Sequence, residues 1–266
     1  MIIDFHTHTF PDKIADKTIE HLAQAAGIKP YRAETVDSLK ESMKRSGIDA
    51  CVVLPVATSV KQVESINRLS AELNGKDGLY FSGAIHPDCE NVEDILDEVK
   101  KAGLFGIKIH PDYQGVYFND ERYIRILKAA AERELITVTH AGVDLAYPND
   151  IHCTPDMVAE VLERLEGIID DKLVLAHMGA AALPERVSEM LVGRPIYFDT
   201  AFVLNMYPEK CLDIIKRHGA EHVLFATDSP WADQKEFANI LNALPLDEEE
   251  KNKIFYLNAQ KLLRIK

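Results

Sequence analysis

The sequence predicts an α/β fold: a distorted (β/α)8 barrel (TIM barrel) that forms a single domain over residues 1–266, with extra helices near its end. Short apolar runs alternate with segments whose apolar residues recur every three or four positions, as strands alternating with helices do. Several runs, such as 51–54 and 135–138, are continuously apolar, which is typical of parallel strands covered on both faces. A doubly wound open sheet is the main alternative, but no Gly-x-Gly-x-x-Gly follows a strand candidate.

The strand candidates are distributed along the whole chain. They are residues 2–5, 50–54, 79–85, 105–109, 135–139, 172–176, 195–198 and 222–226. Helical segments lie between them, and Thr154-Pro155 and Leu183-Pro184 predict helix starts with proline at the first helical position. Eight strands in strict alternation with helices favour a closed barrel over an open sheet.

Three segments exceed what a minimal barrel needs. Residues 11–48 are too long for one crossover, so an extra helix is expected there. The loop 141–154 would lie over the active-site face of a barrel and could form a lid. Residues 247–264 are expected to form terminal helices that pack outside the barrel.

Composition and charge narrow the class of partner. The net charge is −13 and no basic run is present, so neither a nucleic acid nor an anionic membrane is expected as a partner. No stretch is long and apolar enough to span a bilayer. The four cysteines lie far apart without a C-x-x-C pair, which indicates separate thiols of a cytoplasmic protein. A small-molecule substrate, neutral or anionic, is therefore expected, and self-association into a homo-oligomer stays open.

Polar side chains recur where the candidate strands end, which is where barrel enzymes place their catalytic groups. His6 and His8 follow the first strand, and residues two apart in a strand share one face. The later strands end in His86, Lys108 with His110, His140, His177, Asp199 and Asp228.

These residue types predict a metal site. Neutral imidazoles with a carboxylate suit Zn²⁺ or a similar first-row ion, so His6, His8, His140 and Asp228 are the predicted ligands of a divalent metal, with zinc expected and one or two ions bound. Such an ion lowers the pKa of its water toward about 7. His177 would then act on the water or substrate, so Asp228 and His177 are the predicted catalytic groups. The alternatives are a core role for His140 and a helix N-cap role for Asp228.

Lys108 allows three interpretations. It could be a carboxylated bridge between two metals, a cation that binds an anionic substrate group, or a buried lysine paired with a carboxylate; we favour the second. His110, two residues on, is expected to line the same pocket. His86 either lines the pocket or anchors the loop before Pro87. Trp231 is expected to contact the substrate, in an apolar wall with Tyr113, Tyr147 and Phe202.

Taken together, these motifs resemble the metal-dependent amidohydrolase superfamily, and most closely the amidohydrolase-2 subgroup of small-molecule hydrolases and aminocarboxymuconate-semialdehyde decarboxylase-like enzymes. The resemblance covers nearly the whole chain and implies a distorted barrel with one or two divalent metals at the strand ends. The residues that carry it are Asp4–His8, Gly106–Pro111, Thr139-His140, Leu175–Gly179, Phe225–Pro230 and Asn258–Leu263.

The leading functional prediction is a metal-dependent hydrolase of a small amide, ester or lactone that uses a metal-activated water. The alternative is a metal-dependent, non-oxidative decarboxylase of a small carboxylic acid. A deoxyribonuclease of the related barrel family is disfavoured by the acidic composition and by Lys108, where that family's pattern has a glutamate. A non-catalytic metal-binding scaffold is disfavoured because all the expected ligands are present.

Overall fold

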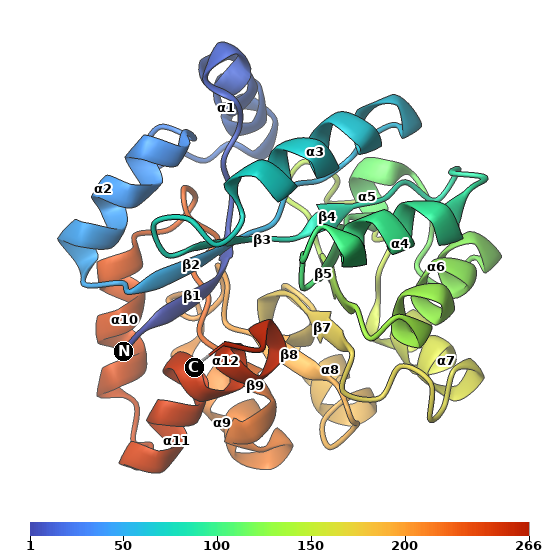
Figure 1. Ribbon diagram of the computed structural model, residues 1–266. Helices are drawn as coiled ribbons and strands as arrows, with labels where there is room; N and C mark the ends of the chain where they lie inside the picture. The colour runs from blue at the N-terminus through green and yellow to red at the C-terminus, as the bar shows by residue number, and fades with distance from the viewer. Residues whose placement is uncertain (266) are drawn as a thin grey trace.

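Parallel strands form the centre of the computed structural model, which describes residues 1–265, and helices lie around them (Figure 1). Within each sheet the neighbours are β1-β2-β3 and β4-β5-β6-β7-β8-β9, and every pair is parallel. The strands are β1 (Ile3–Thr7), β2 (Ala50–Val53), β3 (Leu79–Phe81), β4 (Gly83–Ala84), β5 (Gly106–Ile109), β6 (Ile136–Thr139), β7 (Leu173–Leu175), β8 (Tyr197–Asp199) and β9 (Val223–Leu224).

All the predicted strands are present. β3 and β4 are separated only by Ser82 and together form the strand predicted over 79–85. The chain after β9 returns to β1: the Phe5 N–H donates to the carbonyl of Phe225 at 2.8 Å, and the His8 N–H donates to that of Ser229 at 2.8 Å. These bonds join the last strand to the first, so the strands form a ring and the predicted barrel class is confirmed.

The helices follow the strands in the predicted alternation. They are α1 (Asp12–Ala26), α2 (Val36–Ser46), α3 (Val63–Leu73), α4 (Val92–Lys101), α5 (Pro111–Gln114), α6 (Glu121–Glu132), α7 (Pro155–Arg164), α8 (Pro184–Met190), α9 (Pro208–His218), α10 (Gln234–Ala243), α11 (Glu248–Asn252) and α12 (Asn258–Leu263), with short helical turns at Val60–Gln62, His177–Gly179, Ala220–His222 and Lys253–Leu257. α1 is the extra helix expected within 11–48. Thr154 caps α7 and accepts a hydrogen bond from the Met157 N–H, and Pro155 is the first residue of that helix.

Two apolar clusters hold the layers together. The inner one fills the ring with alternate strand residues such as Phe5, Val52 and Val174, while the outer one lies between strands and helices. Ala259, Leu262 and Leu263 of α12 belong to the inner cluster, together with residues that begin strands. The terminal helix therefore covers the amino-terminal end of the ring, where Figure 1 places it, and leaves the opposite end free for a site.

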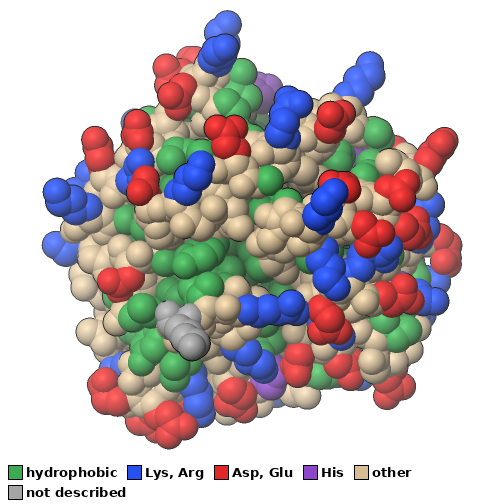
Figure 2. Space-filling model, in the orientation of Figure 1, with side chains coloured by type: hydrophobic (Ala, Val, Ile, Leu, Met, Phe, Trp, Pro, Cys, Tyr) green, Lys and Arg blue, Asp and Glu red, His purple; other side chains and the backbone are tan. Residues whose placement is uncertain are grey.

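The surface carries charges of both signs. Figure 2 shows acidic and basic side chains interspersed over one face, with an apolar patch near its centre. All four cysteines are free, as the sequence predicts, and all four are buried. Among residues 1–265, no helix combines the length and the apolar character that crossing a membrane requires.

Candidate active site

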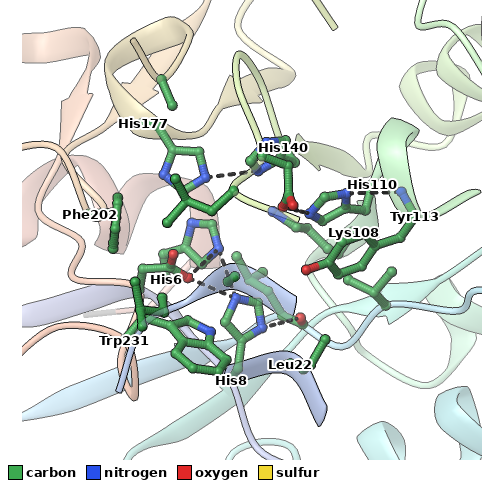
Figure 3. A pocket seen from close by; sticks show the side chains of 18 of the residues that line it. His6, His8, Leu22, Lys108, His110, Tyr113, His140, His177, Phe202 and Trp231 are labelled. Atoms are coloured by element: carbon green, nitrogen blue, oxygen red, sulfur yellow. Dashed lines mark hydrogen bonds and ion pairs between the residues drawn. The ribbon is translucent and has the colours of Figure 1, made fainter. Parts of the chain in front are cut away.

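A cavity of about 330 Å³ lies at the carboxyl ends of the strands, and the predicted site residues converge on it (Figure 3). The predicted residues that line it are His6, His8, Lys108, His110, His140, His177, Asp228 and Trp231. They come from strands far apart in the sequence, so the ring brings together groups that the chain separates.

Three of the residues named from the sequence, His86, Tyr147 and Asp199, are not among the lining residues. His86 is not among the lining residues: its Nδ1 accepts a hydrogen bond from the Asp88 N–H at 3.2 Å, which matches the loop-anchoring alternative. Tyr147 is also absent from the lining and is 46% exposed, whereas Tyr113 and Phe202 do line the cavity. The loop 141–154 contributes Val143–Leu145 to the cavity wall, in the position expected of a lid.

A bulge in β1 directs the two histidines inward. Asp4 pairs with Cys51, and Thr7 pairs with Val53. Between these two pairs β1 covers three residue steps and β2 only two, so β1 contains one extra residue. Asp4 points outward, where its carboxylate accepts hydrogen bonds from Thr227 and Gln234. Regular alternation would place His6 on that outer face, and the bulge moves His6 and His8 to the cavity.

His6, His8 and Asp228 form a compact set of metal-ligand atoms. His8 Nε2 lies 3.2 Å from His6 Nε2 and 3.0 Å from Asp228 Oδ1, and His6 Nε2 lies 3.5 Å from the same oxygen. Ligand atoms bound to one ion at about 2.0–2.2 Å are separated by about 2.8–3.6 Å in tetrahedral or octahedral geometry. The three spacings therefore fit a shared first-row ion.

The second nitrogen of each histidine fixes the orientation of its ring. His6 Nδ1 donates to the carboxylate of Asp199 at 2.8 Å, and His8 Nδ1 donates to the carbonyl of Leu54 at 3.0 Å. In the neutral form, rings held in this way direct their Nε2 lone pairs at each other and at the Asp228 carboxylate. Three acceptors that converge without a donor need a cation between them, which is the role of a metal.

Burial and charge keep this set in the metal-binding form. Burial, together with the nearby Lys108 cation, holds the pKa of His6 well below its usual value. Burial acts to raise the pKa of Asp228, but the neighbouring His6 and His8 outweigh it and the pKa lies well below its usual range. At neutral pH the His6 imidazole is therefore neutral and the Asp228 carboxyl group is ionised, and both lie beside His8.

The fourth predicted ligand, His140, contacts other histidines. Its Nδ1 lies 3.0 Å from His177 Nε2, and its ring stacks on that of His110 with centroids 4.2 Å apart. His177 Nδ1 in turn donates to the carbonyl of Ala201 at 3.0 Å. His140 therefore does not share the three-atom set, and its other nitrogen, Nε2, is buried with no hydrogen-bond partner in the described residues.

A second group of possible ligands, His110, His140 and Asp144, fits a metal less well. The two rings are nearly parallel, at 9°. A ligating imidazole places the ion close to its own ring plane, and two stacked planes cannot share one ion in this way. Burial raises the pKa of Asp144 to about 6, which leaves the carboxylate mostly ionised at neutral pH, so it is the stacking of the two rings that disfavours a shared ion.

Lys108 is a buried cation beside these groups. Its side chain is 1% exposed, and its Nζ has neither a hydrogen bond nor an ion pair among residues 1–265. The interpretation of a lysine paired with a carboxylate is therefore wrong. Burial lowers the pKa of Lys108 to about 8, although Asp199 and Asp228 act in the opposite direction.

Sequence reasoning missed several cavity residues. Asp144 lies in the loop that was expected to act as a lid, and its acidic type could have suggested a role. Glu34 lines the cavity with one carboxyl oxygen unpartnered in the described chain, and burial raises its pKa to about 8. No local pattern marks Glu34, because it precedes a helix in a segment without strand signals.

Comparison with curated protein sequences gave no match. Among solved structures, the chain is similar to 2,6-dihydroxybenzoate decarboxylase from Rhizobium, with 17% identity, a TM-score of 0.71, and coverage of 99% of this chain and 98% of that chain. It is similar to 5-carboxyvanillate decarboxylase from Novosphingobium aromaticivorans, with 16% identity, a TM-score of 0.73, and coverage of 100% and 97%. An uncharacterised TIM-barrel protein from Bordetella bronchiseptica has 16% identity, a TM-score of 0.74, and coverage of 99% and 98%.

These likenesses support the barrel fold. The family model described as amidohydrolase matches residues 3–265, nearly the whole chain. The chain therefore belongs to the amidohydrolase family, as its motifs predict.

Proposed function

We propose that this enzyme is a metal-dependent, non-oxidative decarboxylase of a small carboxylic acid that also carries a hydroxyl group. The observation that carries the proposal is the unpartnered Lys108 ammonium, which faces the same cavity as His6, His8 and Asp228. A buried cation without a counter-ion is costly, and a substrate carboxylate would offset that cost. A neutral amide, ester or lactone would leave the cation unpaired.

The comparisons favour decarboxylation over the hydrolysis that the sequence put first. Two of the similar structures are named decarboxylases, of 2,6-dihydroxybenzoate and of 5-carboxyvanillate. The second holds manganese and 4-hydroxy-3-methoxy-5-nitrobenzoic acid in one of its structures. Both named substrates are anionic aromatic acids, which suits the cation at Lys108.

The metal ligands in this proposal are His6, His8 and Asp228. A divalent ion bound there would orient the substrate carboxylate and hydroxyl and withdraw charge from them. Two imidazoles and a carboxylate accept zinc and manganese alike, so the choice of ion is left to experiment.

The chain's own residues would supply binding and proton transfer. Lys108 pairs with the carboxylate, and the stacked His110 and His140 rings form one wall. In the reaction the bond between carbon and carboxylate breaks, CO₂ leaves, and the electron pair that stays on carbon takes up one proton. His177 and Asp228 are the proposed groups that move this proton, since both line the cavity and His177 exchanges a hydrogen bond with His140.

The test uses carboxyl-labelled hydroxybenzoates, including 2,6-dihydroxybenzoate, with protein loaded with zinc or with manganese. We expect labelled CO₂ in amounts equal to the acid consumed, and at least a tenfold higher KM in Lys108→Met, because a charge-assisted contact contributes about 1.5–3 kcal/mol. A parallel panel of esters, amides and lactones in ¹⁸O-water serves as the control. Incorporation of ¹⁸O without CO₂ release from any acid would overturn the proposal in favour of hydrolysis.

A further inference from the structure

One face of α1 forms an apolar wall of the same cavity. Ile14, Thr18, Leu22 and Ala26 lie four residues apart along the helix, and all four line the cavity. Residues at this spacing lie above one another on one side of a helix. From Ile14 to Ala26 the stripe runs about 18 Å, at about 1.5 Å per residue. We call these four residues the α1 stripe.

The α1 stripe is continuous with the proposed reaction centre. The same cavity is lined by His8 and Lys108, and Figure 3 places Leu22 on the side of His8. Val203 and Met206, from the chain after β8, also line this cavity. The cavity thus has a polar end with a cation and a metal-ligand set, and an elongated arm with apolar walls.

The arm is open to solvent. Ile14 is 49% exposed and Met206 is 59% exposed, although both are large apolar side chains. α1 buries only Ala15 and Ile19, so its stripe is not consumed by packing against the barrel. Apolar side chains grouped at the rim of a cavity gain free energy when an apolar ligand covers them.

We infer that this arm binds an apolar extension of the substrate, so the preferred substrates are carboxylic acids that carry an alkyl or aryl chain. The carboxylate lies at Lys108 and the chain lies along the α1 stripe. This choice of ligand has two grounds. The α1 stripe and Lys108 line one continuous cavity, and the buried Lys108 cation marks its polar end. The inference rests on the proposed function only for the statement that the carboxylate lies at Lys108.

The test measures binding rather than turnover. The ligands are straight-chain alkanoates from butanoate to dodecanoate, titrated calorimetrically into the zinc-loaded protein. We expect the Kd to fall about two- to fourfold for each added methylene, because each buried methylene contributes up to about 0.8 kcal/mol, until the chain reaches the end of the stripe. A Kd that does not change with chain length, or dodecanoate that does not bind, would overturn the inference.

Two variants locate the effect. Leu22→Asp places a charge in the middle of the α1 stripe, and should weaken decanoate binding at least tenfold and butanoate binding much less. Ala25→Asp adds the same charge to an exposed position of the same helix that does not line the cavity, and should bind both acids as the parent does. Circular dichroism checks that both variants retain their helices.

The result separates this inference from its alternatives. A steep chain-length dependence without CO₂ release from any acid would support the arm and refute only the proposed reaction. Sedimentation tests the other occupant, a second copy of this chain. If Leu22→Asp lowers the oligomeric mass and leaves the chain-length dependence intact, the stripe is an interface between copies and the inference is wrong.

Discussion

Replacement of Lys108 by methionine should stabilise the fold. The Lys108 ammonium is buried without a partner, and its pKa falls from 10.5 to about 8 because burial disfavours the charged form. Each pKa unit corresponds to about 1.4 kcal/mol, so protonated Lys108 lowers the free energy of unfolding by about 3 kcal/mol. Methionine has a similar length and no charge, and Lys108→Met should recover most of that energy at pH 7.

The stabilisation that Lys108→Met gives over the parent protein should decrease as the pH rises. The unfolded chain holds the Lys108 proton more tightly than the folded chain does. The free energy of unfolding of the parent protein therefore increases with pH between about 8 and 10.5, where the unfolded state binds more protons. The penalty is complete below about pH 8 and disappears as the pH rises to 10.5. The advantage of Lys108→Met should therefore be about 3 kcal/mol at pH 7, or roughly 6–12 °C in Tm, and should nearly vanish near pH 10.5.

Urea unfolding of the metal-free protein at pH 7 and near pH 10.5 measures this difference. Lys17→Met, on an exposed face of α1, is the matched control and should change stability little at either pH. A Lys108→Met protein that is less stable at pH 7, or equally stabilised at both pH values, would refute the reasoning. Metal content should be unchanged in this variant; its loss would instead support the carboxylated bridge.

The remaining predictions concern the metal and the proton path. The double variant His6→Ala/His8→Ala should lose its divalent ion, and elemental analysis that finds full occupancy would contradict the ligand assignment. Asp199→Asn should weaken metal binding about 10–100-fold. The His177 and Ala201 N–H groups both donate to Oδ1, so the amide oxygen stays there and an NH2 group replaces the acceptor that orients His6. Competition with a chelator measures this, and an unchanged Kd would exclude the orienting role. His177→Asn should lower kcat about 10²–10⁴-fold with the metal retained, and wild-type turnover across the pH range would eliminate His177 as the group that moves a proton.

The sequence by itself determined the order of elements and the strand ends that carry chemistry. Continuous apolar runs need cover on both faces, so they predict buried parallel strands without reference to distant residues. Thr154-Pro155 predicts the start of α7 for a similarly local reason, because a proline at the first helical position sacrifices no hydrogen bond. Since parallel strands of a barrel end on one side, His8, His177 and Asp228 could be expected to meet there.

Only the tertiary structure decided which of these groups face one another. The bulge in β1 turns His6 away from the outer face that holds Asp4, and simple alternation cannot predict such an inserted residue. The pairing of His140 with His177 and the entry of the α1 stripe into the cavity depend on contacts between segments far apart in the chain. Sequence periodicity indicates which residues are buried but not which residues they contact. The ligand set, the unpaired Lys108 and the apolar arm could therefore be recognised only in the folded structure.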